Sequence, residues 1–167
     1  SGKGGTGKTT VTANIGAALS LRGHLTVVVD MDMGLRTLDI ALGLESNIVY
    51  DVAEAIEGSC TLDDVLIKDT RFENLYFIPS SQTRSDINAD EEKIKAFWEN
   101  VKNRFEYCIA DSPAGLCGGF EYAANNTDRA IVVTLPETSA LRDADRLISV
   151  LEKKEINDIK LIINRIK

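Results

Sequence analysis

The sequence predicts an α/β fold in which a mostly parallel sheet carries helices on both faces. Continuously apolar, β-branched segments of strand length alternate with segments of helical periodicity along the chain. Strands that are apolar on both sides are typical of parallel sheets buried between helices. Polar residues follow several of these strands directly, at the edge where such sheets bind their ligands. Since the sequence contains no linker, repeat or low-complexity segment, we expect residues 1–167 to belong to a single domain.

The first half of the chain follows this alternation from Thr9 onward. Ala and Leu favour a helix over Thr9–Leu21, which Gly23 ends, and the β-branched run Leu25–Asp30 follows as a strand. The segment Gly34–Gly43 is expected to be a loop or a short helix. The remaining elements of this half are a short helix Val52–Ile56 stopped by Gly58, another over Leu62–Ile67 capped by Thr61, and a strand Asn74–Ile78 closed by Pro79.

The second half begins with the clearest amphipathic helix, Asp90–Phe105. Its apolar face consists of Ile94, Phe97, Trp98, Val101 and Phe105, and Glu and Lys occupy the other face. Ser139 is predicted to cap a later helix. The apolar stripe of that helix is predicted to be Leu141, Ala144, Ile148 and Leu151. The strands expected in this half are Tyr107–Ala110, Ala130–Thr134 and Lys160–Ile163, the last one followed by Asn164.

Composition restricts the classes of function. Nineteen Lys and Arg residues against 26 Asp and Glu residues give a net charge of −7, which argues against a protein that coats nucleic acid by net charge alone. No apolar run approaches the roughly 20 residues of a membrane helix. The three cysteines are widely spaced, so neither a disulfide framework nor a zinc site is expected.

The segment Gly2–Thr9 satisfies the phosphate-loop pattern G-x-x-x-x-G-K-[ST]. Glycines allow backbone N–H groups to curl around phosphate oxygens, and the helix that follows directs its positive end at the same anion. In such loops the lysine, here Lys8, reaches the β- and γ-phosphates, and the hydroxyl of Thr9 is a ligand for Mg²⁺. A glycine-rich turn would not require Lys and Thr at this spacing. The motif therefore predicts nucleotide binding and the fold of a P-loop NTPase.

A phosphate loop of this type normally follows a strand. We therefore expect the first strand of the sheet to be missing from this chain, in the position immediately before Ser1. The strands that are present should then leave an empty slot in the sheet.

Carboxylates follow two of the predicted strands. Asp30 and Asp32 end the first, and Asp111 ends a later one, as the aspartate of a Walker B motif does. Such groups can orient an attacking water or support Mg²⁺, although each segment could also be an ordinary turn at a strand end. Together with Asn164, these residues are expected to meet at one edge of the sheet. Lys3 is either a solvated loop lysine or a charge supplied to phosphate, in the manner of an arginine finger.

These residues resemble the deviant Walker A ATPases, whose phosphate loop carries an early lysine such as Lys3. Within that superfamily, the sequence is most similar to the MinD family of septum-site-determining ATPases. The resemblance covers the whole chain and about the first two-thirds of a usual family member. The segments that carry it are Gly34–Asp39, Leu66–Leu75, Gln82–Arg84, Asp111–Gly115 and Ser139–Arg146.

The resemblance implies a role for each matching residue. Lys3 would reach the nucleotide of the partner subunit in an ATP-bound dimer, and Asp32 would orient the hydrolytic water. Asp111 would support Mg²⁺ through water. The residues that would bind ATP and Mg²⁺ are Lys3, Gly4, Gly5, Thr6, Gly7, Lys8, Thr9 and Thr10, with Asn164 and Arg165 at the adenine edge. Two positions depart from the family pattern: Thr6 replaces a usual Val, and Cys117 stands where a carboxylate is expected.

The function implied by the resemblance is an ATP-hydrolysing, ATP-dimerised switch that positions the cell-division septum. Such a protein works in the bacterial cytoplasm, peripherally at the inner face of the membrane through a C-terminal amphipathic helix. It recruits the division inhibitor MinC, and MinE or an equivalent factor stimulates hydrolysis. A DNA-partitioning ATPase is disfavoured by the charge of −7, and a flagellar-number regulator by the segment Ile67–Asn74. A non-hydrolysing, nucleotide-dependent scaffold is the alternative from another class.

Overall fold

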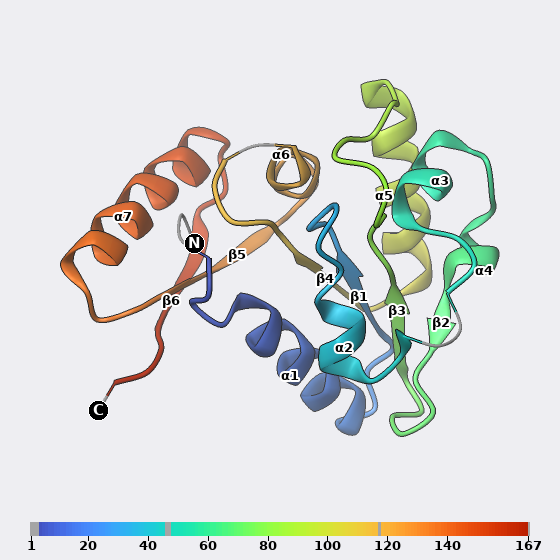
Figure 1. Cartoon of the computed structure of the whole chain (residues 1–167), viewed down its shortest axis with the longest axis horizontal. Coiled ribbons are helices and arrows are strands. Elements are labelled where there is room, and N and C mark those ends of the chain that lie inside the picture. Colours follow the sequence, from blue (N-terminus) through green and yellow to red (C-terminus); the bar gives the residue numbers. More distant parts are fainter. Residues whose placement is uncertain (1–3, 46–47, 117, 167) are drawn as a thin grey trace. The chain divides into compact units, whose positions relative to one another are not determined.

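The computed structural model describes residues 4–45, 48–116 and 118–166 (Figure 1). The chain divides into two compact units. The larger unit is Thr9–Ser112, and the smaller unit combines Ser1–Lys8 with Pro113–Lys167. Each unit contains its own sheet and its own hydrophobic core.

The larger unit is built on a four-stranded sheet in the order β2-β3-β1-β4. Its strands are β1 (Thr26–Asp30), β2 (Ile67–Lys68), β3 (Leu75–Ile78) and β4 (Tyr107–Asp111). The central strand β1 pairs in parallel with both β3 and β4, and every residue of β1 is buried. Only β2, at the edge, runs antiparallel. The β-branched run of β1 thus corresponds to a strand covered on both faces, as predicted.

Helices cover both faces of this sheet. On one face, α1 (Lys8–Leu21) and α2 (Leu38–Leu42) share a core cluster with Val28, Leu75 and Phe77. A Cβ atom at Gly16 of α1 would lie 2.6 Å from Cγ1 of Val28, so glycine is what allows this close approach. On the other face, the ring of Phe105 at the end of α5 (Glu91–Arg104) packs edge-on against Tyr76 of β3.

Short helices fill the segment between β1 and β3. Residues 34–43 were expected to form a loop or a short helix, and they contain the short helix α2. Gly43 ends this helix in the left-handed conformation. Two further helices, α3 (Val52–Glu57) and α4 (Leu62–Val65), begin with capping boxes at Asp51 and Thr61, and such caps stabilise a helix by about 1 kcal/mol each. The prediction that α4 extends to Ile67 was wrong, because Ile67 belongs to β2 and pairs with Phe77 of β3.

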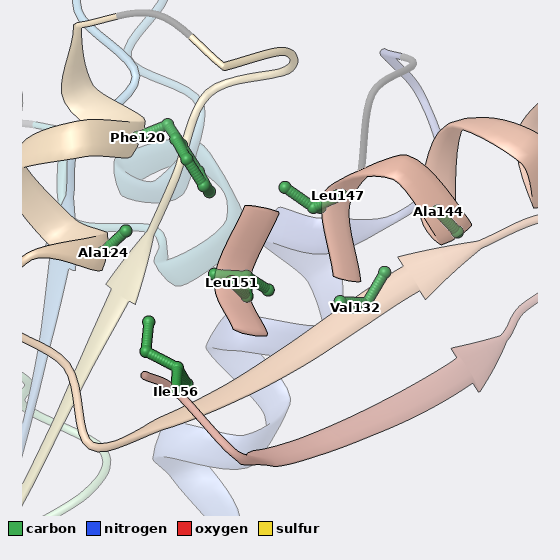
Figure 2. Packing of buried hydrophobic residues seen from close by; sticks show 7 residues of the cluster. All are labelled: Phe120, Ala124, Val132, Ala144, Leu147, Leu151 and Ile156. Carbon is green, nitrogen blue, oxygen red and sulfur yellow. The ribbon is translucent and has the colours of Figure 1, made fainter. Parts of the chain in front are cut away.

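The smaller unit pairs β5 (Arg129–Thr134) in parallel with β6 (Asp158–Ile163). Its helices are α6 (Gly119–Ala124) and α7 (Thr138–Lys153). Figure 2 shows the core of this unit, formed by side chains from α6, β5, α7 and the turn before β6. Its members are Phe120, Ala124, Val132, Ala144, Leu147, Leu151 and Ile156.

Two details of α7 differ from the sequence expectation. Ser139 does not cap the helix, because the N–H of Leu141 already donates to the carbonyl of Glu137 and so places Ser139 inside the first turn. The buried stripe is Ala140, Ala144, Leu147 and Leu151. Leu141, predicted to lie in the stripe, is 40% exposed, whereas Ile148 is partly buried against the core.

The two sheets are not joined by strand pairing in the described part of the chain. Among the described helices, none has the length and apolar character needed to cross a membrane.

Candidate functional site

The described part of the phosphate loop, Gly4–Lys8, lies in the smaller unit directly before the body of α1. Gly5 and Gly7 have φ angles of +76° and +97°, in the left-handed region that glycine favours. Alternation of such residues with ordinary ones turns successive N–H groups toward one side, which is how backbone loops hold anions. The geometry therefore suits a phosphate group at the start of α1.

The side chain of Thr6 turns inward from this loop. Thr6 is 1% exposed, and its hydroxyl has no hydrogen-bond partner among the described residues. The loop thus accommodates threonine in place of the usual valine by burying its side chain.

Asn164 lies at the end of β6, and its side chain contacts the phosphate loop. Its Nδ2 donates to the carbonyl of Thr6 at 2.9 Å, and its backbone N–H donates to the carbonyl of Thr134 at 2.8 Å. The family resemblance implied that Asn164 reads the adenine edge, and the contact with Thr6 was not predicted. Arg165, expected beside it, is exposed and has a φ of 57°.

Three carboxylates gather in the larger unit and form what we call the carboxylate region: Asp30, Asp32 and Asp111. Asp30 and Asp111 are register partners at the ends of β1 and β4, so their predicted meeting at one sheet edge is confirmed. Asp32 follows two residues later and is half-buried. Asn164 belongs to the other unit, and its expected meeting with these carboxylates stays a prediction.

Asp30 is completely buried and holds the ends of the loop that contains Asp32. One carboxylate oxygen accepts the N–H of Asp32 at 2.9 Å, and the other accepts the N–H of Leu38 at 3.2 Å. Burial raises the pKa of Asp30 to about 7, with smaller contributions from the charges of Asp111 and Asp32, although the two N–H donors act in the opposite direction. The Asp30 carboxyl group therefore fixes the shape of the loop, although its burial disfavours the charged form.

Asp111 is 2% exposed and accepts a hydrogen bond from the hydroxyl of Thr12 at 3.3 Å. Its backbone carbonyl accepts the N–H of Met31, which ties the end of β4 to the loop after β1. Thr12 was not singled out in the sequence. Its position one turn after Thr9 in α1, on the buried side of the helix, is the signal that could have identified it.

Two buried serines after β3 hold the other side of the loop at Asp32. The Ser80 hydroxyl donates to the carbonyl of Asp32 at 3.2 Å, and the carbonyl of Ser81 accepts the N–H of Gly34 at 2.7 Å. Sequence reasoning missed both serines. Their place directly after Pro79, at the carboxyl end of a predicted strand, was the available signal.

The remaining predicted site residues have simpler surroundings. The Thr9 hydroxyl lies 3.5 Å from that of Thr37, and the exposed Thr10 accepts a hydrogen bond from Asn14 through its carbonyl. Lys8 is half-buried. Lys3 and Cys117 lie outside the described residues.

The donor set fits a magnesium ion held mainly by phosphate and water. In the described ranges, no group of three His, Cys, Asp or Glu residues could hold a metal ion alone. The available oxygen donors, the Thr9 hydroxyl and the Asp111 carboxylate, are of the type that Mg²⁺ prefers, since this ion usually takes one or two protein ligands beside substrate phosphates.

Comparison with known families and proteins gives consistent matches. A family described as "AAA domain" matches residues 1–163. The septum site-determining protein MinD of Synechocystis is 48% identical over the whole chain. The chain spans 63% of the length of that relative.

Solved structures give the same result. The MinC:MinD cell division protein complex of Aquifex aeolicus contains a chain that is 44% identical, with a TM-score of 0.89 over 100% of this chain and 67% of that one. The septum site-determining protein MinD of Pyrococcus horikoshii, complexed with Mg-ADP, is 32% identical, with a TM-score of 0.83 over 99% and 68% of the two chains. The similarity therefore extends to a P-loop NTPase fold of the predicted type.

Proposed function

Since the chain belongs to the MinD family of septum site-determining proteins, we propose that it is the nucleotide-binding part of an ATP-hydrolysing switch. The observation that carries the proposal is the phosphate loop, in which Gly5 and Gly7 have left-handed conformations directly before α1. The MinD relative solved with Mg-ADP supports the assignment of the ligand. By this proposal, residues 1–167 form the core of one ATPase domain.

The loop residues bind the phosphate chain of ATP. The N–H groups of Gly4, Gly5, Thr6 and Gly7 surround the phosphate oxygens, and Lys8 neutralises their charge. Thr10 caps the helix near the α-phosphate, and Asn164 with Arg165 reads the adenine edge. Thr9 would bind Mg²⁺ directly and Asp111 would support it through water; when bound, the ion would supply further charge neutralisation at the γ-phosphate.

Hydrolysis depends on Asp32. Its carboxylate orients a water molecule for attack on the γ-phosphate, with little covalent chemistry by the protein. The Asp30 carboxylate and the Ser80 hydroxyl bind the backbone of Asp32 from two sides, so the loop that carries it has a defined shape before nucleotide arrives.

The switch works through association. Lys3 contacts the nucleotide of a second copy, so that ATP joins two chains into a dimer. Dimerisation pairs two weak membrane anchors outside this segment, which increases membrane affinity without any new contact. MinC is the proposed partner because a 44% identical relative was solved as a MinC:MinD complex. MinE or an equivalent factor then stimulates hydrolysis and releases the protein from the membrane.

The test is ATP turnover by the full-length protein with and without liposomes, combined with light scattering. Wild-type protein should dimerise with ATP and hydrolyse it faster when liposomes and the stimulating factor are present. Lys3→Ala should bind ATP but stay monomeric. Dimerisation of Lys3→Ala would return Lys3 to the role of a solvated loop residue, and absence of turnover by the wild type would favour a non-hydrolysing scaffold.

A further inference from the structure

The amide group of Asn164 is fixed at both ends, and one end lies on the phosphate loop. Its Nδ2 donates to the carbonyl of Thr6 at 2.9 Å, while its Oδ1 accepts the N–H of Arg165 at 2.9 Å. The backbone N–H of Asn164 donates to Thr134 at the end of β5. A single side chain thus connects the loop to the paired strands β5 and β6 within one unit.

The fit between this side chain and the loop is close. A Cβ atom at Gly7 would lie 2.5 Å from Nδ2 of Asn164, which is shorter than real Cβ contacts. Glycine at this position therefore serves two purposes, because it permits a φ of +97° and leaves room for the amide. Thr6 on the other side of the contact is fully buried, so its carbonyl is held in place.

The paired strands hold the backbone of Asn164 in place. Asn164 directly follows the last residue of β6, where Ile163 is in register with Thr134. The Thr134 hydroxyl is buried and donates to the carbonyl of Ala140 in α7, so the point to which Asn164 is attached is itself fixed on two sides. A side chain that starts from such a point can hold a glycine-rich loop, whose own backbone has little intrinsic preference for one shape.

We propose that Asn164 is a positioning residue for the phosphate loop and preforms it for a triphosphate chain, whatever base the nucleotide carries. This role rests on the proposed function and adds to base recognition. An amide has two N–H hydrogens and an oxygen with two lone pairs, so the contacts with Thr6 and Arg165 leave capacity for an adenine edge. A preformed loop binds phosphate more tightly because less ordering is needed on binding.

The experiment separates the contribution of the loop to affinity from that of the nucleotide base. It uses ligands that carry different bases and one that carries none. Wild-type full-length protein and its variants are loaded with a fluorescent ATP analogue, which is then displaced by Mg-ATP, Mg-GTP or Mg-tripolyphosphate. Asn164→Ala removes the contact with Thr6. Asn164→Asp keeps the size of the side chain but has no N–H to donate. Asn157→Ala is the matched control, because Asn157 lies just before the same strand, is exposed, and donates to the local carbonyl of Glu155.

Loss of one such hydrogen bond should weaken binding of all three competitors by about threefold to tenfold in Asn164→Ala, and at least as much in Asn164→Asp. Tripolyphosphate should show this loss although it has no base, and ATP should lose at least as much because Asn164 also reads the adenine edge. The thermal midpoint without ligand should match that of Asn157→Ala. A midpoint of Asn164→Ala well below that of Asn157→Ala would show a general loss of structure and would contradict a specific role in the loop.

Two results would overturn the proposal. One is weaker binding of ATP in Asn164→Ala with unchanged binding of tripolyphosphate, which would make Asn164 a base-reading residue only. The other is a wild-type protein that binds Mg-ATP but not tripolyphosphate, because a preformed loop must hold the phosphate chain alone. Failure of the wild type to bind Mg-ATP would instead contradict the proposed function, and this proposal with it.

Discussion

The phosphate loop and the carboxylate region keep their functional atoms in place by different means. The loop depends on backbone shape: two glycines with left-handed φ angles, and a single side-chain amide from Asn164 that bonds a backbone carbonyl. The carboxylate region depends on buried side chains, since Asp30 and Ser80 bond the backbone around Asp32 and Thr12 bonds Asp111. Changes of shape should therefore affect the loop, and changes of charge or hydrogen bonding should affect the carboxylates.

The largest expected effect is on the rate of ATP hydrolysis, and it comes from a substitution in the carboxylate region that should leave ATP binding intact. Asp32→Ala should reduce the rate of ATP hydrolysis by roughly 100-fold or more, because it removes the group that orients water. Affinity for Mg-ATP should change little, since the phosphate loop is intact. Single-turnover kinetics with parallel binding measurements would test this, and normal turnover would remove Asp32 from the site.

The next effect tests backbone shape in the loop. Gly7→Ala should weaken ATP binding by at least roughly tenfold, because a side chain at positive φ costs about 1–2 kcal/mol and its Cβ would strike Asn164. Gly4→Ala is the matched variant. Among the described residues, no atom lies within 4 Å of its added Cβ, so its loss should be smaller. Equal losses measured by calorimetry would contradict the importance of the Gly7 conformation.

The raised pKa of Asp30 predicts a pH dependence of stability. The folded chain binds this proton more tightly than the unfolded chain, because burial raises the pKa from its ordinary value of 3.8 to about 7. The free energy of unfolding should therefore fall, on account of Asp30, as the pH rises through this interval. Asp30→Asn cannot titrate, so denaturant unfolding between pH 4 and 7 should show a flatter dependence. An unchanged slope would show that Asp30 titrates normally.

The smallest effect concerns the serines that hold the loop at Asp32. Ser80→Ala should lower kcat for ATP by about twofold to tenfold with little change in KM, because one hydrogen bond to the Asp32 carbonyl is lost. Ser81→Ala is the control. Its hydroxyl is equally buried but has no partner among the described residues, and its backbone carbonyl remains. Equal kcat values for the two variants would exclude a positioning role for Ser80.

Sequence predicted the fold and the ends of the strands well because those depend on local patterns. The β-branched run of β1 and the amphipathic face of α5 are each visible within a few residues. The start of α7 was misplaced because Ser139 and Glu137 offer competing first turns, and only the backbone hydrogen bond of Leu141 decides between them. The edge strand β2 was missed because its two residues form a strand only by pairing with β3.

For the candidate site, the sequence identified the residue types that carry the chemistry. It did not identify the residues that hold them, namely Thr12, Ser80 and the loop contact of Asn164. Each of these contacts joins residues more than 40 positions apart, so no local motif reveals it. The raised pKa of Asp30 was likewise hidden, because it results from complete burial between neighbouring elements.

The most direct test of the account is the affinity of the full-length protein for Mg-ATP, compared between wild type and Lys8→Ala. Calorimetric titration should give saturable binding of one ATP per chain for the wild type and no measurable binding for Lys8→Ala, with both proteins folded by circular dichroism. Intact affinity in Lys8→Ala would contradict the assignment of Gly2–Thr9 as a phosphate loop, and with it the proposal of an ATP-driven switch.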